Sequence, residues 1–473
     1  MSKRGAEVTS RNELKYPISE SQPINPGDGD SVANWSTDVT GGGKDDAADS
    51  YHVEISAHGD TSATSINNMQ TLMHIFKGNL GTGILSLPVA VKNAGLWTGL
   101  AGILCVGGIA VHCMHMLIGC NQILCKRTGR EVLDYAGVMQ MCLKTGPPYL
   151  QGFSSYVRPF VDALLIFTQL GACCVYIVFI ATNIQMVVGY FVSFDLNVRL
   201  YEFFVMLVLL PFVCIRNLRL LAPFSAFANV LTLTGLIIII QYIVQDLPDT
   251  SERPAFSSFT DIPLFFGTAI FAVEGIGLVL PLRNSMQRPQ DFGGWFGVLN
   301  LGMCATVCLY AAIGFYGYLK FGEGVASTIT LSLPDEKLYV SVRLMFAISI
   351  LITYNIQFYV PITIIWSSVT PKIRGDLLKK ILEYVLRIGI VLLTFGFAVA
   401  VPHIDLLISL IGAVACSFLA LILPAFIEIV TLAMEDAPMP KLTVIKDVLI
   451  FLFGLFGTVI GTYISMASII DTF

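Results

Sequence analysis

Two ionisable side chains lie inside strongly apolar stretches of the sequence. Glu274 is in the middle of the apolar stretch 262–282. A carboxylate in the hydrocarbon core of a membrane is costly unless it faces water or takes up a proton, so Glu274 is a candidate proton carrier. His74, near the start of the stretch 71–91, is a second candidate because imidazole changes charge near physiological pH. The alternatives are a protonated glutamate that bonds to another helix, and a structural histidine.

Glycine interrupts the same two stretches. Residues 74–88 contain Gly-Asn-Leu-Gly-Thr-Gly and residues 266–281 contain Glu-Gly-Ile-Gly, and in each a proline follows four or five residues later. A pair of interrupted helices in opposite orientation indicates the binding site of a secondary transporter. The free N–H groups of a half-helix favour a carboxylate and the free carbonyls favour an ammonium group, so the pattern predicts an amino-acid site. The alternative is that the glycines only allow close helix packing.

Both interruptions contribute to the predicted substrate site. Its carboxylate-binding part is expected at the N–H groups from Gly81 to Gly83, and its ammonium-binding part at carbonyls near Phe271 and Glu274. The predicted substrate-binding residues are Gly78, Asn79, Gly81, Thr82, Gly83, Phe271, Glu274 and Gly275.

Further polar side chains occur in the third and eighth apolar stretches, where they either line a cavity or bond between helices. These are Gln169, Tyr176, Asn183, Tyr354, Asn355 and Gln357. The six histidines and eleven cysteines show no spacing typical of metal ligands. We therefore expect no metal and no cofactor, with protons acting as co-substrate.

The composition places the chain in a lipid bilayer. Of its 473 residues, 55% are hydrophobic and only 13% are charged, which is more apolar surface than a water-soluble core can hide. Apolar stretches of about 20 residues, the length that a helix needs to cross the hydrocarbon, recur to the C-terminus. They predict an all-α polytopic membrane protein with eleven transmembrane helices. The expected spans are 71–91, 95–120, 159–190, 200–215, 221–244, 262–282, 294–319, 338–366, 382–402, 405–430 and 445–468.

The distribution of loop charges predicts the orientation. With the N-terminus in the cytosol, the loops on the opposite side hold only Lys92, Arg199, Arg253, Lys320 and Lys337, and the cytosolic loops hold most of the other basic residues. This is the positive-inside pattern, and an odd number of spans then places the C-terminus outside the cytosol. The sequence does not choose between the plasma membrane and an endosomal or lysosomal membrane.

Residues 1–70 differ from the rest of the chain. They are rich in Ser, Gly, Asp and Asn, a composition that cannot bury a core, so we expect a disordered cytosolic tail followed by a transporter domain at 71–470. The tail is where cytosolic nutrient-signalling partners would bind. No basic stripe indicates a nucleic-acid partner.

Several motifs resemble those of one known family. They are Lys77 to Gly83 (KGNLGTG), Pro88 to Gly95 (PVAVKNAG), Val111 to Met114 (VHCM), Phe265 to Phe271 (FFGTAIF), Glu274 to Gly277 (EGIG), Ile329 to Leu331 (ITL) and Gln357 to Pro361 (QFYVP). Together these motifs resemble the proton-coupled amino acid transporter family, solute carrier family 36, a branch of the amino acid/auxin permeases.

The resemblance implies the 5+5 inverted-repeat fold of the bacterial leucine transporter. The repeats would cover about 71–244 and 262–430, with an extra helix at about 445–468. It also implies alternating-access proton symport of small neutral amino acids such as glycine, alanine and proline, and no enzymatic activity. In that family a first-span histidine is assigned to proton coupling, and His74 occupies the matching place.

Two other functions remain open at this point. A sodium-coupled amino acid transporter can use the same fold, and Thr82, Thr353 and Tyr354 could supply oxygen ligands for Na⁺. An amino acid-sensing, receptor-like transporter would report nutrient status through the tail. A membrane enzyme is disfavoured because the histidines are dispersed along the chain.

Overall fold

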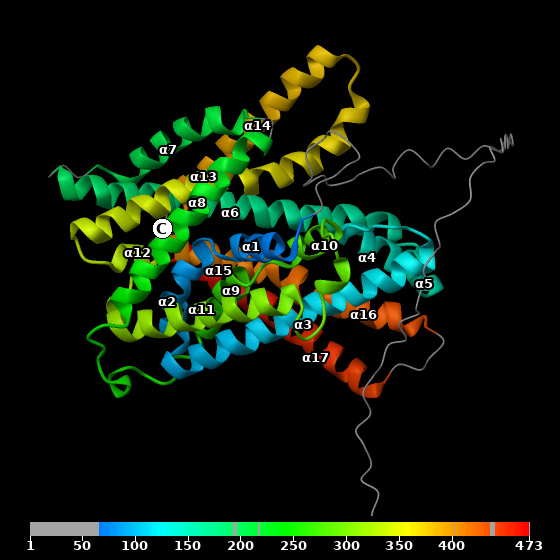
Figure 1. The fold of residues 1–473 in the computed structure, drawn as a ribbon, viewed down its shortest axis with the longest axis horizontal. Coiled ribbons are helices and arrows are strands. Elements are labelled where there is room, and N and C mark those ends of the chain that lie inside the picture. Colours follow the sequence, from blue (N-terminus) through cyan, green and yellow to red (C-terminus); the bar gives the residue numbers. More distant parts are fainter. Residues whose placement is uncertain (1–65, 193–195, 216–217, 402, 436–439, 473) are drawn as a thin grey trace, which may run out of the picture. The chain divides into compact units, whose positions relative to one another are not determined.

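The computed structural model describes residues 66–192, 196–215, 218–401, 403–435 and 440–472. The predicted tail, with its expected signalling partners, lies almost entirely outside these residues. The described chain is nearly all helical (Figure 1), and the β pairing found within it is a single parallel bridge between Ile66 and Met286.

The α-helices are α1 (Asn68–Asn79), α2 (Thr82–Ala94), α3 (Leu96–Thr128), α4 (Tyr135–Lys144), α5 (Pro148–Gln151), α6 (Ser154–Phe191), α7 (Val198–Val213), α8 (Leu218–Ile243), α9 (Ile262–Ala272), α10 (Ile276–Asn284), α11 (Val298–Phe321), α12 (Ile329–Ser332), α13 (Lys337–Val369), α14 (Asp376–Ala400), α15 (Ile404–Ile411), α16 (Leu423–Ala433) and α17 (Lys441–Ile470). Short 3-10 helices are η2 (Thr250–Glu252), η3 (Pro289–Asp291), η4 (Gly322–Gly324) and η5 (Thr370–Lys372), and two π-helical segments, η6 (Gly412–Cys416) and η7 (Phe418–Ile422), connect α15 to α16.

Nine helical stretches within the described residues are long and apolar enough to cross a membrane. They correspond to the expected second and third spans and to the fifth through the eleventh. The expected first span is present as α1 and α2, which are separate short helices because the chain is interrupted at residues 80–81. The expected fourth span is α7, whose 16 residues give a helix of about 24 Å at the usual rise per residue.

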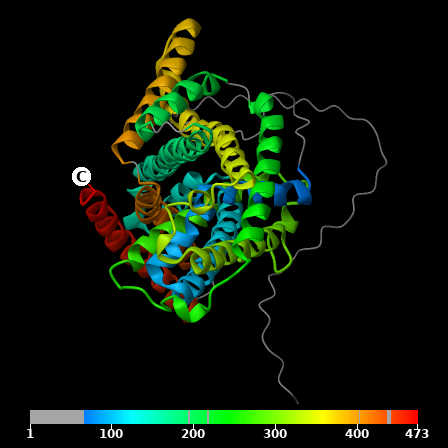
Figure 2. The ribbon, with the colours of Figure 1, turned by 90° about the vertical axis from the view of Figure 1, so that its left-hand side faces the viewer.

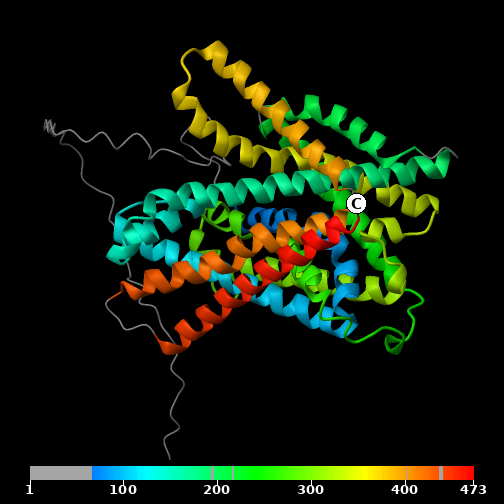
Figure 3. The same ribbon diagram turned by 180° about the vertical axis from the view of Figure 1, so that it is seen from behind.

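The two interrupted spans lie at the centre of the helix packing. The helix α2 packs against α9 and α11, and α9 in turn packs against α15 and η6. The long helices α6 and α13 pack along each other on one side of this centre. The last helix, α17, lies at the periphery in Figure 2 and runs alongside α16 in Figure 3, consistent with its contacts to α9, α15 and α16.

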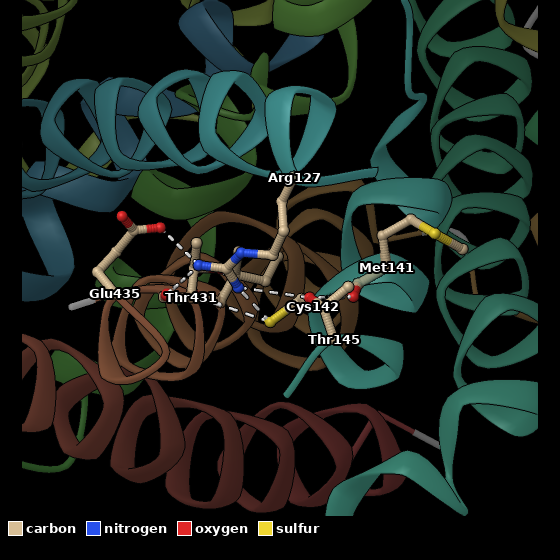
Figure 4. Close-up of polar contacts among 7 residues, drawn as sticks. Arg127, Met141, Cys142, Thr145, Thr431 and Glu435 are labelled. Atoms are coloured by element: carbon tan, nitrogen blue, oxygen red, sulfur yellow. Dashed lines mark hydrogen bonds and ion pairs between the residues drawn. The ribbon is translucent and has the colours of Figure 1, made fainter. Parts of the chain in front are cut away.

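One end of the bundle holds the end of α3, the helix α4 and the end of α16. We call it the inner end, because the charge distribution predicts that it faces the cytosol. There Arg127 of α3 reaches across to α16 and α4 (Figure 4). Its Nη2 lies 2.5 Å from Glu435 Oε1 and donates to the Thr431 carbonyl at 3.2 Å, and its Nη1 donates to Thr145 Oγ1 at 3.5 Å. The Arg127 guanidinium group thus lies at the C-terminal end of α16, where a cation interacts favourably with the helix dipole.

Candidate substrate site

A small cavity lies between the two helix interruptions. Its volume of ≈ 30 Å³ is room for roughly two water molecules. The lining residues come from both interrupted spans and from α6 and α13: Gly78, Asn79, Gly81, Thr82, Gly83, Thr168, Gln169, Ala172, Tyr176, Phe271, Ala272, Glu274 and Gln357. A cavity of this size admits a small ligand only when the surrounding side chains move.

The structure brings most of the predicted site residues together. Of the eight residues expected to bind substrate, only Gly275 does not line this cavity. Gly275 lines an adjacent cavity of ≈ 10 Å³, to which Asn79 also contributes. Asn79 therefore separates two spaces, one between the helix interruptions and a more apolar one bounded by Leu278, Phe292 and other residues.

A tyrosine from α11 ties the two interruptions to each other. The hydroxyl oxygen of Tyr310 lies 2.5 Å from the Asn79 carbonyl, at the end of α1, and 2.7 Å from the Ala272 carbonyl, at the end of α9. Both carbonyls are left without helical partners where the helices stop, and Tyr310 is fully buried. The single hydroxyl hydrogen of Tyr310 is thus shared between two buried helix ends, and the Asn79 carbonyl also accepts from the Gly81 N–H at 3.0 Å.

The cavity presents several groups that can accept hydrogen bonds. The Glu274 side chain forms no hydrogen bond or ion pair within the described part of the chain, and Glu274 lines the cavity. Asn79 Oδ1, Gln169 Oε1 and Thr82 Oγ1 are buried, and among the described residues none of these atoms has a hydrogen-bond partner. An ammonium group carries three donors and no acceptor, so it complements this set of oxygens.

The start of α2 provides donors on another side of the same cavity. The N-cap of α2 is Gly81, which has no side chain to cap the helix, and its own N–H bonds to the Asn79 carbonyl at 3.0 Å. The N–H groups of Thr82 and Gly83 belong to the first turn, where a helix offers unpaired donors and partial positive charge. A carboxylate fits this helix end.

The glycines of the two interruptions have different roles. A Cβ at Gly83 would lie 2.8 Å from the Ala272 Cα, and one at Gly275 would lie 3.1 Å from the Asn79 amide. These two glycines allow close packing, the alternative that the sequence left open. A Cβ at Gly81 would lie 3.4 Å from the Tyr176 hydroxyl, which is an ordinary contact. Gly81 is thus the glycine whose absence of a side chain mainly preserves space in the cavity.

The two proton-carrier candidates lie in different surroundings. Glu274 lines the cavity, whereas His74 does not, and its side chain on α1 is exposed. The structure therefore does not bring His74 and Glu274 into one cavity.

Several cavity residues were named from the sequence only as alternatives or were missed. Gln169, Tyr176 and Gln357 are at the cavity, whereas Asn183 donates to the Phe179 carbonyl at 2.8 Å instead. Three lining residues were not predicted: Thr168, Ala172 and Ala272. The helical spacing of residues 168, 169, 172 and 176 along one face of α6 is the signal that could have identified the first two.

Comparisons with known proteins identify the family of the chain. A family model described as transmembrane amino acid transporter protein matches residues 64–467. The chain is 34% identical over 405 residues to the proton-coupled amino acid transporter-like protein pathetic of Drosophila melanogaster, covering 85% of each protein. It is 28% identical over 428 residues to the probable amino acid transporter skat-1 of Caenorhabditis elegans, covering 87% of this chain and 92% of that protein.

A solved structure identifies the fold. The chain is similar to MhsT, a transporter with the leucine-transporter fold, in its crystal structure with L-phenylalanine. The TM-score is 0.50 at 13% sequence identity, covering 84% of this chain and 98% of that one. This confirms the expected fold class, an all-helical membrane protein with the inverted-repeat architecture, and the relatives are transporters, not enzymes. The chain is a multi-pass membrane protein that belongs to the transmembrane amino acid transporter family.

Proposed function

We propose that this transporter carries small neutral amino acids together with protons. The observation that supports this most directly is that Glu274 lines the cavity and its carboxyl group has no ion-pair partner in the described part of the chain. A carboxyl group in this position can take up a proton as the substrate enters, and it loses its charge when it does so. The small cavity volume favours substrates such as glycine, alanine and proline.

The proposed binding mode uses both helix interruptions. The substrate carboxylate binds at the first turn of α2, near Thr82 and Gly83, and its ammonium group binds the oxygens of Glu274, Asn79 and Gln169. Protonation from the acidic side neutralises the carboxyl group and lets the interrupted helices close over the substrate. Release follows on the more alkaline side, the cytosol, which the charge distribution predicts that the inner end faces. The acidic side is then the cell exterior or the lumen of an endosome or lysosome.

The positions of the hydroxyl groups considered for sodium binding support proton coupling over sodium coupling. Thr353 donates to the Ser349 carbonyl at 2.8 Å, and the Tyr354 hydroxyl lies 3.0 Å from Thr394 Oγ1. Neither side chain lines the cavity, so only Thr82 of the three could bring a hydroxyl oxygen to a cation there.

The test is uptake of labelled glycine, alanine and proline into proteoliposomes with an acidic exterior, with and without Na⁺. We expect uptake that follows the pH gradient without Na⁺, and its loss in Glu274→Gln. The matched control is Glu202→Gln, since Glu202 is a buried membrane glutamate of α7 that does not line the cavity. His74→Ala tests the second candidate.

Three outcomes would contradict the proposal. Uptake that requires Na⁺ would select the sodium-coupled alternative. Substrate binding without uptake would favour a receptor-like role. Gradient-driven uptake that survives in Glu274→Gln would show that another residue carries the coupled proton. Loss of uptake in His74→Ala alone would indicate that this residue is His74.

A further inference from the structure

Four ionisable side chains from three helices meet where α3, α16 and the start of α17 come together. We call them the inner cluster: His112 of α3, Glu428 of α16, and Lys446 and Asp447 of α17. The Lys446 Nζ lies 2.8 Å from His112 Nε2, 2.8 Å from Glu428 Oε2 and 2.9 Å from Asp447 Oδ1. One ammonium group thus links the peripheral helix α17 to α3 and α16.

The contacts of Lys446 determine the charge of the inner cluster. An ammonium group can only donate hydrogen bonds, so His112 Nε2 accepts one and the imidazole ring is neutral in this arrangement. The cluster then contains one positive charge and two carboxyl groups. With both carboxyl groups ionised, it carries one negative charge in excess.

The burial of Asp447 makes this excess charge unfavourable. Its side chain is 0% exposed, and within the described residues its oxygens make no hydrogen bond beyond the 2.9 Å ion-pair contact of Oδ1 with Lys446 Nζ. Glu428 is also largely buried and shares the Lys446 ammonium group with Asp447, since Lys446 Nζ lies 2.8 Å from Glu428 Oε2 and 2.9 Å from Asp447 Oδ1. Two carboxyl groups that share a buried site with a single cation cannot both remain ionised without a large desolvation cost. One shared proton removes the excess charge and gives Asp447 a hydrogen-bond partner.

Within the described residues, the surrounding groups do not supply a second cation. The other titratable side chains found there facing the inner cluster come from α3 and are His115, Cys113 and Cys120. The ring of His115 is held by Asn300 of α11, with 2.7 Å between His115 Nε2 and Asn300 Oδ1. The two cysteine side chains are buried.

We infer that the inner cluster is a proton-binding site, in which Glu428 and Asp447 share one proton and its presence holds α17 against α3 and α16. Loss of that proton leaves an unbalanced negative charge between the helices and weakens their contact. The site is separate from the cavity, since none of its four residues lines the cavity wall. It therefore does not depend on the proposed role of Glu274.

Infrared difference spectroscopy of the purified full-length protein tests this inference, because a protonated carboxyl group absorbs apart from a carboxylate. Spectra are recorded between acidic and alkaline pH for the wild type, Asp447→Asn and Glu428→Gln. We expect a protonated-carboxyl signal in the wild type that disappears on raising the pH and is missing in both variants. The thermal unfolding temperature of the wild type should fall over the same pH range, and that of Asp447→Asn should change much less.

Two matched variants separate this site from other carboxyl groups. Asp471→Asn changes an exposed aspartate at the far end of α17 and should keep the signal. Glu274→Gln should also keep it, so failure of the proton-coupling proposal would leave this result intact. A wild-type signal that persists in both cluster variants, or no such signal in the wild type, would overturn the inference. Should Asp447→Asn fail to fold, Glu428→Gln carries the same test.

Discussion

The substitution Tyr310→Phe removes a single oxygen atom that connects the two helix interruptions. That hydroxyl lies 2.5 Å and 2.7 Å from the carbonyls of Asn79 and Ala272. The Asn79 carbonyl keeps its bond from the Gly81 N–H, so we expect the loss to fall mainly on the Ala272 carbonyl. The aromatic ring stays in place, and the packing of α11 should therefore be preserved.

The expected magnitude follows from the burial of these groups. Leaving a buried carbonyl without its donor costs about 1 to 3 kcal/mol. If the whole cost falls on the closed arrangement of the interrupted helices, the middle of that range corresponds to a loss of roughly thirtyfold in substrate affinity. Overall stability should decrease by a similar free energy, because the same contact is lost on unfolding.

The measurements are substrate binding and uptake in proteoliposomes, together with thermal unfolding of the purified protein. The matched control is Tyr318→Phe on the same helix, where the hydroxyl donates to Glu323 Oε1 at 2.8 Å instead of to a helix interruption. Tyr310→Phe should lose affinity and Tyr318→Phe should not. Equal substrate affinity in the two variants would refute the idea that Tyr310 holds the site together.

Two further substitutions test the packing around the site and at the inner end. Gly83→Ala places a Cβ 2.8 Å from the Ala272 Cα and should destabilise the fold by about 1 to 3 kcal/mol, measured by thermal unfolding. The control Gly108→Ala, whose Cβ meets no atom within 4 Å, should be nearly neutral in the same assay. Equal effects of the two substitutions would contradict the packing role of Gly83. Arg127→Ala removes a partly exposed ion pair at the end of α16 and should cost no more than about 1 kcal/mol. Its control is Lys126→Ala, the preceding exposed residue. A loss of stability in Arg127→Ala several times larger than about 1 kcal/mol would contradict the small contribution expected of a partly exposed ion pair.

Local sequence patterns predicted the interrupted helices because the cause of each interruption is local. The alternation of glycine with apolar residues around Gly81 and Gly275 located the breaks, which the structure places at residues 80–81 and 273–275. The same pattern did not show which glycine serves packing and which preserves space. That distinction depends on the helix opposite each glycine, such as Ala272 facing Gly83.

The tertiary contacts were not predictable because they join residues that are far apart in the sequence. Tyr310 lies 231 residues from Asn79 in the sequence, and nothing in the apolar stretch around it indicates a hydrogen bond to a helix end. The inner cluster was also missed. In the sequence, His112 and Glu428 belong to separate spans and look like isolated residues near helix ends. Only the meeting of α3, α16 and α17 makes them one site.

The two titratable sites predict two separable responses to pH. Glu274 lies at the cavity between the interruptions, so its protonation should change substrate uptake. The inner cluster lies between α3, α16 and α17, and α17 follows both predicted repeats, so its protonation should change stability and helix docking first. A pH profile of transport in the wild type would contain both effects. The profile of Asp447→Asn should retain only the component that depends on Glu274, because the substitution removes the second proton without touching the cavity.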